Sequence, residues 1–253
     1  MKTIMITGAT SGFGEASARL FSKKGWKLIL TGRRQERLER LQKELGGVDI
    51  VHCCCFDISN RQAVEEAFQS LPEAFSNIDV LLNNAGLALG LESVENTDLD
   101  DWEKMVDTNI KGLMYCTRTI LPMMKQRGLG YIINIGSVAG NWPYPGGNVY
   151  CATKAFVRQF SLAIRADLLG SGIRVTNIEP GNAETEFSDV RFNQDNDRAE
   201  KVYQNMVALT AQDIADTVFW LANTPEHMNV TTMEIMPTEQ STGPLAIYRR
   251  DQE

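Results

Sequence analysis

The chain has 253 residues, of which 43% are hydrophobic and 23% are charged. This balance is typical of a folded globular protein and excludes a disordered chain. The length suits one large α/β domain, so we expect a single domain over residues 1–253. The net charge of −7 argues against a protein that binds duplex nucleic acid, because such a protein needs a basic surface.

Cysteine usage indicates a reducing compartment. The chain has five cysteines, three of which are consecutive at Cys53, Cys54 and Cys55. An odd number in a long chain favours free thiols over a disulfide framework, and with only two histidines present we expect buried packing residues and no metal site. No hydrophobic run reaches the roughly 18 residues that a membrane span needs. We therefore expect a cytoplasmic protein with no membrane or nucleic-acid partner.

Short hydrophobic runs alternate with amphipathic segments along the chain. Strands are expected at residues 3–6, 27–31, 51–56, 79–83, 131–135 and 173–178. Helices are expected at residues 16–25, 33–45, 60–68, 99–127 and 150–169, and Pro122 should kink the fourth helix or lie near its end. Residues 182–196 are polar and are expected to be irregular. The alternation predicts an α/β fold, with three α/β/α layers around a doubly wound parallel sheet.

A glycine-rich loop lies between the first expected strand and the first helix. Glycines allow a tight turn there and let backbone N–H groups approach the phosphates of a dinucleotide, next to the positive end of the helix dipole. The spacing differs from the common G-x-G-x-x-G, and many glycine loops are only turns, but this position favours nucleotide binding. The candidate residues are Gly8, Thr10, Ser11, Gly12, Phe13 and Gly14.

The residues after the second expected strand bear on the choice of cofactor. An NAD site usually places an acidic residue there, whereas this chain has Arg33 and Arg34. Guanidinium groups pair with the additional phosphate of NADP, which an acidic residue would repel. The alternative is that the two arginines only begin a charged surface helix. We predict a preference for NADP(H).

Tyr150 and Lys154 are four residues apart at the start of an expected helix, which places both side chains on one face. A free phenol has a pKa of about 10, and a nearby ammonium group or a positively charged nicotinamide ring favours the phenolate. Such a phenol can give a proton to a carbonyl or take one from an alcohol. Taken alone, a Tyr-x-x-x-Lys pair is more often an exposed helix pair.

Three further segments favour the catalytic interpretation. Ser137 follows the strand at 131–135, so its hydroxyl should lie at the edge where open α/β sheets bind ligands, although a turn or capping serine is the alternative. Asn109 is a polar residue inside an expected helix. Residues 83–86, Asn-Asn-Ala-Gly, close the fourth strand with small residues that can pass close to a cofactor.

Together these motifs resemble, in order and spacing, the short-chain dehydrogenase/reductase family over residues 2–237. The matching positions are the loop at 7–14, residues 83–86, Asn109, Ser137, Tyr150, Lys154, Pro180 and Gly181. The resemblance implies a Rossmann-type fold and an NADP-dependent oxidoreductase acting on CH–OH groups, with the cofactor providing the hydride.

The resemblance also implies roles for individual residues. Tyr150 is the acid/base, Lys154 binds the nicotinamide ribose and lowers the pKa of Tyr150, Ser137 polarises the substrate carbonyl, and Asn109 holds a water that links Lys154 to solvent. Cofactor contacts are implied for the glycine loop, Tyr150, Lys154 and the following residues: Arg33, Arg34, Asp57, Ile58, Asn84, Ala85, Gly86, Pro180, Gly181, Ala183, Thr185 and Phe187.

Finer likeness points to the NADP-dependent 3-hydroxy acid dehydrogenase group within this family. It is carried by residues 142–150, 154–161, 185–188, 190–192, 199–201, 203–205 and 236–237. That group acts on serine and allo-threonine and reduces short 3-oxo acids such as malonic semialdehyde, so 3-hydroxypropionate is a further expected substrate. The sequence departs from the pattern at Asn182, Ala183 and Glu184, which leaves the conformation of this segment open.

An acidic substrate needs a cation, and Arg191 can form two parallel hydrogen bonds to a carboxylate. The alternative is that Arg191 pairs with Asp189 or Glu186 in solvent. Two other functions remain open: a carbonyl or ketone reductase of broad specificity, and a non-catalytic regulator that senses NADP. The family is usually tetrameric, so the resemblance implies a homotetramer, and the tail at 247–253 could reach a neighbouring subunit or be frayed.

Overall fold

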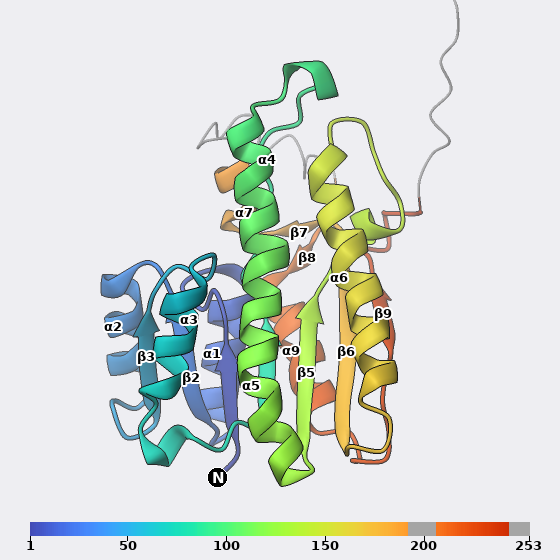
Figure 1. Ribbon diagram of the computed structural model, residues 1–253. Helices are drawn as coiled ribbons and strands as arrows, with labels where there is room; N and C mark the ends of the chain where they lie inside the picture. The colour runs from blue at the N-terminus through green and yellow to red at the C-terminus, as the bar shows by residue number, and fades with distance from the viewer. Residues whose placement is uncertain (192–205, 243–253) are drawn as a thin grey trace, which may run out of the picture.

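The computed structural model describes residues 1–191 and 206–242, and a parallel sheet of seven strands forms its centre. The strand order is β3-β2-β1-β4-β5-β6-β9, and each neighbouring pair is parallel. The strands are β1 (Thr3–Ile6), β2 (Lys27–Gly32), β3 (Val51–Cys55), β4 (Val80–Asn83), β5 (Gly130–Ile135), β6 (Ile173–Pro180) and β9 (Thr232–Ile235). The expected doubly wound α/β fold is confirmed (Figure 1).

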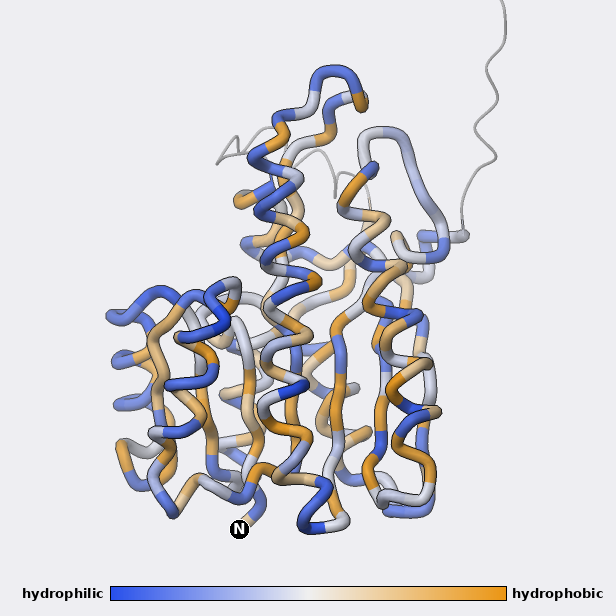
Figure 2. Tube along the Cα trace, viewed as in Figure 1, coloured by the Kyte–Doolittle hydropathy of each residue, from blue (hydrophilic) through white to orange (hydrophobic). Residues whose placement is uncertain are grey.

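Helices cover both faces of the sheet because neighbouring residues of each strand point to opposite sides. Ile4 and Ile6 pack with α1 (Gly12–Lys23), α2 (Gln35–Glu44) and α9 (Ala211–Ala222), whereas Met5 packs with α3 (Arg61–Gln69), α5 (Leu113–Arg127) and α6 (Asn148–Asp167). Figure 2 shows hydrophobic residues repeating along the strands, while the outer helix α2 is mostly hydrophilic. Both faces of the sheet are therefore buried, as the continuous hydrophobic strands require.

The long helical stretch before β5 differs from the expectation in one respect. It consists of α4 (Leu99–Val106), a π-helical segment (Asp107–Gly112) and α5. Pro122 lies inside α5, which continues to Arg127. The change in helical pattern thus lies at Asn109 and not at Pro122, and π-helical segments are frequent at functional sites.

The segment after β6 is more ordered than its polar sequence suggests. Residues up to Arg191 form a two-residue strand, β7 (Ala183–Glu184), and a short helix, α7 (Glu186–Arg191). β7 pairs in parallel with β8 (Leu209–Thr210), so the expectation of an irregular segment is wrong as far as residue 191. The sequence departs from the family pattern at this strand: Ala183 and Glu184 form β7, and Asn182 directly precedes it. Residues 192–205 and 243–253, which carry several of the likenesses noted above and the tail, lie outside the described residues.

The three consecutive cysteines lie on β3 with different exposures. Cys54 is buried, Cys53 is half-buried and Cys55 is exposed. The interpretation as buried packing residues therefore holds for Cys54 and is wrong for Cys55, because β3 is at the edge of the sheet. In the described parts of the chain, no helix has the length and hydrophobicity required to cross a membrane.

Candidate active site

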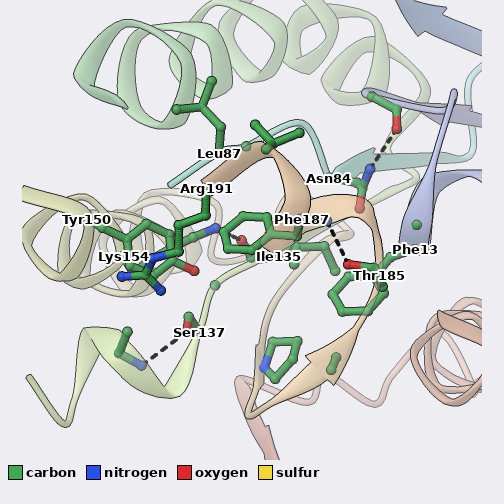
Figure 3. Close-up of a pocket in the computed structure, with 18 of the residues that line it drawn as sticks. Phe13, Asn84, Leu87, Ile135, Ser137, Tyr150, Lys154, Thr185, Phe187 and Arg191 are labelled. Atoms are coloured by element: carbon green, nitrogen blue, oxygen red, sulfur yellow. Dashed lines mark hydrogen bonds between the residues drawn. The ribbon is translucent and has the colours of Figure 1, made fainter. Parts of the chain in front are cut away.

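A cavity of about 1110 Å³ opens at the carboxyl ends of the strands. The strand order reverses between β1 and β4, so their connections leave in opposite directions and a crevice forms where ligands bind in open α/β sheets. The cavity extends from Asp57 and Arg33 at one end to Trp142 and Tyr144 at the other. α7 and the residue before it lie across the cavity, and Figure 3 shows Thr185 before the helix and Phe187 and Arg191 on it.

The glycine loop forms one wall of this cavity. Gly8 and Gly12 have φ values of 65° and 52°, a backbone conformation that side chains strongly disfavour. A Cβ on Gly14 would lie 2.3 Å from the Gly8 carbonyl oxygen and 2.6 Å from Asn84 Nδ2. The Asn84 amide also donates to the Thr7 carbonyl at 2.9 Å, which fixes β4 to the loop. Glycine is therefore required here for a close approach of helix α1 to the loop.

Two arginines at the end of β2 occupy different surroundings. Arg33 is exposed, and its nearest acid is Asp57 at 3.5 Å. Arg34 donates to Thr10 Oγ1 at 2.8 Å and to Ser11 Oγ at 2.8 Å, so it is fastened to the loop. Both line the cavity. This end is thus rich in guanidinium donors beside a concave wall of backbone, as a phosphate group requires.

The Lys154 side chain is buried and lines the cavity. Its Nζ donates to the Ile135 carbonyl at 2.8 Å, at the end of β5. A Cβ on Gly86 would lie 3.5 Å from Lys154 Nζ and 3.3 Å from Asn109 Oδ1, so a glycine leaves room for these polar groups to approach each other. Burial lowers the pKa of Lys154 from 10.5 to about 8.

Asn109 lies on the π-helical segment and does not line the cavity. Its Oδ1 accepts from the Leu87 N–H at 2.8 Å, and its Nδ2 donates to the Leu87 carbonyl at 2.8 Å and to Thr153 Oγ1 at 3.1 Å. The side chain thus connects the segment after β4 to α6. The water relay through Asn109 stays a prediction.

Tyr150 is buried at the floor of the cavity, one helical turn before Lys154, and its ring centroid is 5.8 Å from Lys154 Nζ. Burial, together with the neighbouring Tyr144, raises the pKa of Tyr150, while a hydrogen bond with Ser137 and the charge of Arg191 act in the opposite direction. The expected lowering of this pKa by Lys154 is therefore not found in the protein alone. The physical reason is that removal of a phenolate from water disfavours its charge more than these neighbours stabilise it.

Ser137 begins a short turn after β5. Its Oγ accepts from the Ala139 N–H at 3.1 Å, which is the capping role considered above, and it also hydrogen-bonds with Tyr150. A turn serine can therefore serve both purposes. Ser137 and Tyr150 both line the cavity, and Figure 3 shows their side chains below α7.

Arg191, at the end of α7, reaches towards Tyr150 (Figure 3). Its guanidinium carbon is 5.6 Å from the ring centroid of Tyr150, and its Nη2 donates to the Tyr144 hydroxyl at 2.9 Å. Its Nε donates to the Gly90 carbonyl at 3.2 Å. The Glu186 carboxylate pairs with Arg34 and Arg37, and the side chain of Asp189 lies outside the described residues. A cation thus lies near the ring of Tyr150.

The cavity brings together all the residues that the sequence assigned to cofactor and substrate, except Gly14, which lies under the loop. Sequence reasoning missed several other residues of the wall, because they lie far apart in the chain: Leu91, Tyr144, Glu186, Val190, Met236 and Gln240. Gln240 Oε1 accepts from the Asn182 N–H at 2.7 Å, so the segment after β9 supports the start of β7. Tyr144, Glu186, Val190 and Met236 lie in segments that carry the likeness to the hydroxy acid dehydrogenase group, but their place in the cavity wall depends on tertiary contacts.

This architecture agrees with comparisons to known proteins. A model of the short chain dehydrogenase family matches residues 2–196. The chain belongs to the short-chain dehydrogenase family. The NADP-dependent 3-hydroxy acid dehydrogenase YdfG of Escherichia coli is 55% identical over 248 residues, covering 98% of this chain and 99% of that protein. A serine 3-dehydrogenase of Agrobacterium fabrum is 51% identical over 248 residues, covering 98% of each chain.

Solved structures of family members show the same architecture. A closed form of serine dehydrogenase complexed with NADP⁺ has a TM-score of 0.96 and 55% identity, covering 98% of this chain and 100% of that chain. Serine dehydrogenase from Escherichia coli has a TM-score of 0.84 and 50% identity, covering 94% of this chain and 99% of the other. Because 98% of this chain is covered in the first comparison, the likeness is not confined to the sheet.

Burial of Lys154 predicts a stability effect in this short-chain dehydrogenase. Below pH 8 the amine is charged in both the folded and unfolded chains, so the full penalty of about 3 kcal/mol for burying the charge applies. The penalty declines as the pH rises from 8 to 10.5, since the folded chain then carries a neutral amine. Lys154→Met removes this penalty but also removes the hydrogen bond to the Ile135 carbonyl, which is worth about 1 kcal/mol. The variant should therefore raise the free energy of unfolding of the cofactor-free protein by about 2 kcal/mol at pH 7.

Urea unfolding of the wild type and Lys154→Met between pH 7 and 9.5 measures this difference. The advantage of the variant should shrink above pH 8. Lys125→Met is the matched control, because Lys125 is exposed on α5, and it should change the free energy of unfolding by less than about 0.5 kcal/mol. A Lys154→Met protein less stable than the wild type at pH 7 would contradict the assigned burial penalty.

Proposed function

We propose that this protein interconverts short 3-hydroxy acids and 3-oxo acids, using NADP(H). Serine, allo-threonine and 3-hydroxypropionate are the proposed alcohols, and malonic semialdehyde is a proposed oxo acid. The coarser activity, an NADP-dependent dehydrogenase acting on CH–OH groups, follows from the family and from the relatives named above. The observation that carries the finer proposal is the position of Arg191, a cation within 5.6 Å of the Tyr150 ring centroid.

The cavity wall fits a dinucleotide on geometric grounds, because Gly8 and Gly12 leave the backbone open and a Cβ at Gly14 would clash with the loop. Arg33 would hold the additional phosphate of NADP(H), and Arg34, which donates to Thr10, Ser11 and Glu186, would add positive charge beside it. Asp57 and Ile58, which line the cavity, would contact the adenine, and Pro180 and Phe187, which also line it, would cover the nicotinamide. When bound, NADP(H) provides or accepts the hydride.

The protein's own contribution is to orient the substrate and to manage one proton. Because burial raises the pKa of Tyr150, its hydroxyl is protonated at neutral pH and can donate to a carbonyl oxygen. Ser137 offers a second hydroxyl beside it, which would hold the same oxygen. Lys154, whose Nζ is fixed by the Ile135 carbonyl, supplies positive charge beneath the phenol as the proton leaves.

Arg191 would hold the substrate carboxylate. Its position near the rings of Tyr144 and Tyr150 supports this role, because a three-carbon acid with its oxygen at Tyr150 would reach the guanidinium group. The protein carries a net charge of −7, which does not attract anions, so a local cation is needed for an acidic substrate. The aromatic lining by Trp142, Tyr144 and Phe187 is what favours the second candidate, a reductase of uncharged ketones.

We expect Tyr150→Phe to lower kcat by at least about 10³-fold, since it removes the hydroxyl that transfers the proton while keeping the ring. Absorbance at the NADPH band measures turnover, and fluorescence titration measures NADPH affinity, which should stay within about threefold of the wild type. Retention of wild-type turnover in this variant would show that another group transfers the proton.

Arg191→Ala should raise the KM for serine or 3-hydroxypropionate by about 10²-fold, as expected for loss of a charge-assisted carboxylate contact. The KM for a small neutral alcohol should change little. An unchanged KM for the acids would place the carboxylate anchor elsewhere, and efficient turnover only of neutral ketones by the wild type would favour the broad carbonyl reductase. A protein that binds NADPH but turns over none of these compounds would instead be an NADP-sensing regulator.

The assembly and location belong to the same proposal. A homotetramer would form through the helical stretch of α4 and α5 together with α6, and a second hollow between α4 and α6, lined by Leu99, Trp102 and Val149, supports this. Light scattering should give four times the 28.2 kDa chain mass, and the mass of a single chain would contradict it.

All five cysteines are free, which supports a reducing cytoplasm.

A further inference from the structure

The two ends of α7 contact opposite ends of the cavity. Glu186, the first residue of α7, contacts the arginines beside the phosphate loop, and Arg191, the last, contacts Tyr144 and the Gly90 carbonyl. The backbone reinforces the second contact, because the Gly90 N–H donates to the Arg191 carbonyl at 3.0 Å. A six-residue helix is too short to be stable by itself, so tertiary contacts must hold it in place.

The Glu186 carboxylate joins two arginines that are themselves fixed. Its Oε1 and Oε2 both accept from Arg37 Nη1 at 2.9 Å, and Oε2 accepts from Arg34 Nη1 at 3.2 Å. Arg37 Nη1 also lies 3.3 Å from the Thr10 carbonyl. Burial alone would raise the pKa of Glu186, but the hydrogen bonds from Arg37 and Arg34 lower it. The carboxylate is therefore charged at neutral pH.

Arg34 differs from Arg33 in how its donors are used. The Nε, Nη1 and Nη2 atoms of Arg34 all have acceptors in the protein, namely Thr10, Ser11 and Glu186. Arg33 has a side chain that is 67% exposed, and its ion pair with Asp57 is long, at 3.5 Å. Arg33 is thus the more available guanidinium for the phosphate of the cofactor, while Arg34 is committed to the wall.

From this arrangement we infer that Glu186, Arg34 and Arg37 form an ion-pair clasp that positions α7, and with it Arg191, over Tyr150. Glu186 is a positioning residue for the hydroxy acid, although it lies at the phosphate end of the cavity. The inference rests on the proposed role of Arg191 as the carboxylate anchor. The clasp links three elements, α2, the glycine loop and α7, so its loss releases α7 at one end while the contacts of Arg191 remain.

Neighbouring contacts explain why the clasp is needed. Thr185 lies against Gly12, where a Cβ would be 3.5 Å from the Thr185 Cβ, and Phe187 packs beside Tyr150 with ring centroids 5.8 Å apart. These side-chain contacts are van der Waals and ring contacts, which define the orientation of α7 only loosely. The Arg37 guanidinium contacts both oxygens of the Glu186 carboxylate, and hydrogen bonds between charged groups have a defined geometry. This contact therefore fixes the orientation of the first residue of α7.

The first experiment measures α7 itself, without activity. Hydrogen exchange followed by mass spectrometry on the cofactor-free full chain should show amides of residues 185–191 exchanging about fivefold faster in Glu186→Gln and in Arg37→Gln. Glu44→Gln is the matched control: Glu44 pairs with Arg19 at 2.8 Å and Arg40 at 3.8 Å but has no contact with α7. Equal exchange in the wild type and in both clasp variants would overturn the inference.

The second experiment measures the consequence for the substrate. At saturating NADP⁺, Glu186→Gln and Arg37→Gln should each raise the KM for the hydroxy acid about fivefold with kcat within about twofold of the wild type. The double variant should be no worse than the worse single variant, since both changes break one clasp. Additive losses, or an effect on kcat alone, would contradict a positioning role.

The two experiments separate failure of the clasp from failure of the proposed function. If Arg191→Ala leaves the KM unchanged while the clasp variants still exchange faster, the anchor is wrong and the clasp stands. If Arg191→Ala raises the KM while the clasp variants match the wild type in exchange and KM, the clasp is wrong and the proposed function stands.

Discussion

The site depends on one buried charge, the Lys154 ammonium group, held by the Ile135 carbonyl at the carboxyl end of β5. Burying an amine is unfavourable, and the drop of the Lys154 pKa to about 8 expresses that cost. The surrounding polar groups are arranged around it: Asn109 is fixed by Leu87 and Thr153, and Gly86 leaves the space between Asn109 and Lys154 open. The chain thus accepts a local loss of stability in order to keep a cation beneath the Tyr150 phenol, as functional sites often do.

The parallel sheet makes this arrangement possible, because the segments that follow its strands all begin at the same edge. Ser137 follows β5, residues 84–86 follow β4, the glycine loop follows β1 and the arginines follow β2. Tyr150 comes from α6, whose first turn stands above this edge within a small cluster of Ala88, Met105, Ala139 and Cys151. α7 then closes the opposite side with one acidic end and one basic end. Its acidic end pairs with Arg34 and Arg37 beside the glycine loop, and its basic end lies near the ring of Tyr150, so the two charges of one short helix act at opposite ends of the cavity.

Much of this could be predicted from the sequence because the signals are local. The hydrophobic runs located six of the seven strands of the sheet, and the glycine loop, Ser137 and the Tyr150–Lys154 pair located the cavity. The failures have a common physical origin in tertiary contacts. The polar residues of α7 predict an irregular segment, since nothing in their order reveals that Arg34 and Arg37 lie opposite Glu186. Likewise, the four-residue spacing suggests that Lys154 acidifies Tyr150, but it contains no information on the burial that raises the pKa of the phenol.

A crystal structure of the ternary complex with NADP⁺ and a hydroxy acid would show whether Tyr150 and Ser137 hold the reacting oxygen. The hydroxyl oxygen of the substrate should lie within hydrogen-bond distance of both Tyr150 and Ser137, with its carbon facing the nicotinamide ring and its carboxylate at Arg191. A complex in which the Tyr150 hydroxyl points away from the ring, or in which the substrate oxygen contacts neither hydroxyl, would contradict this prediction.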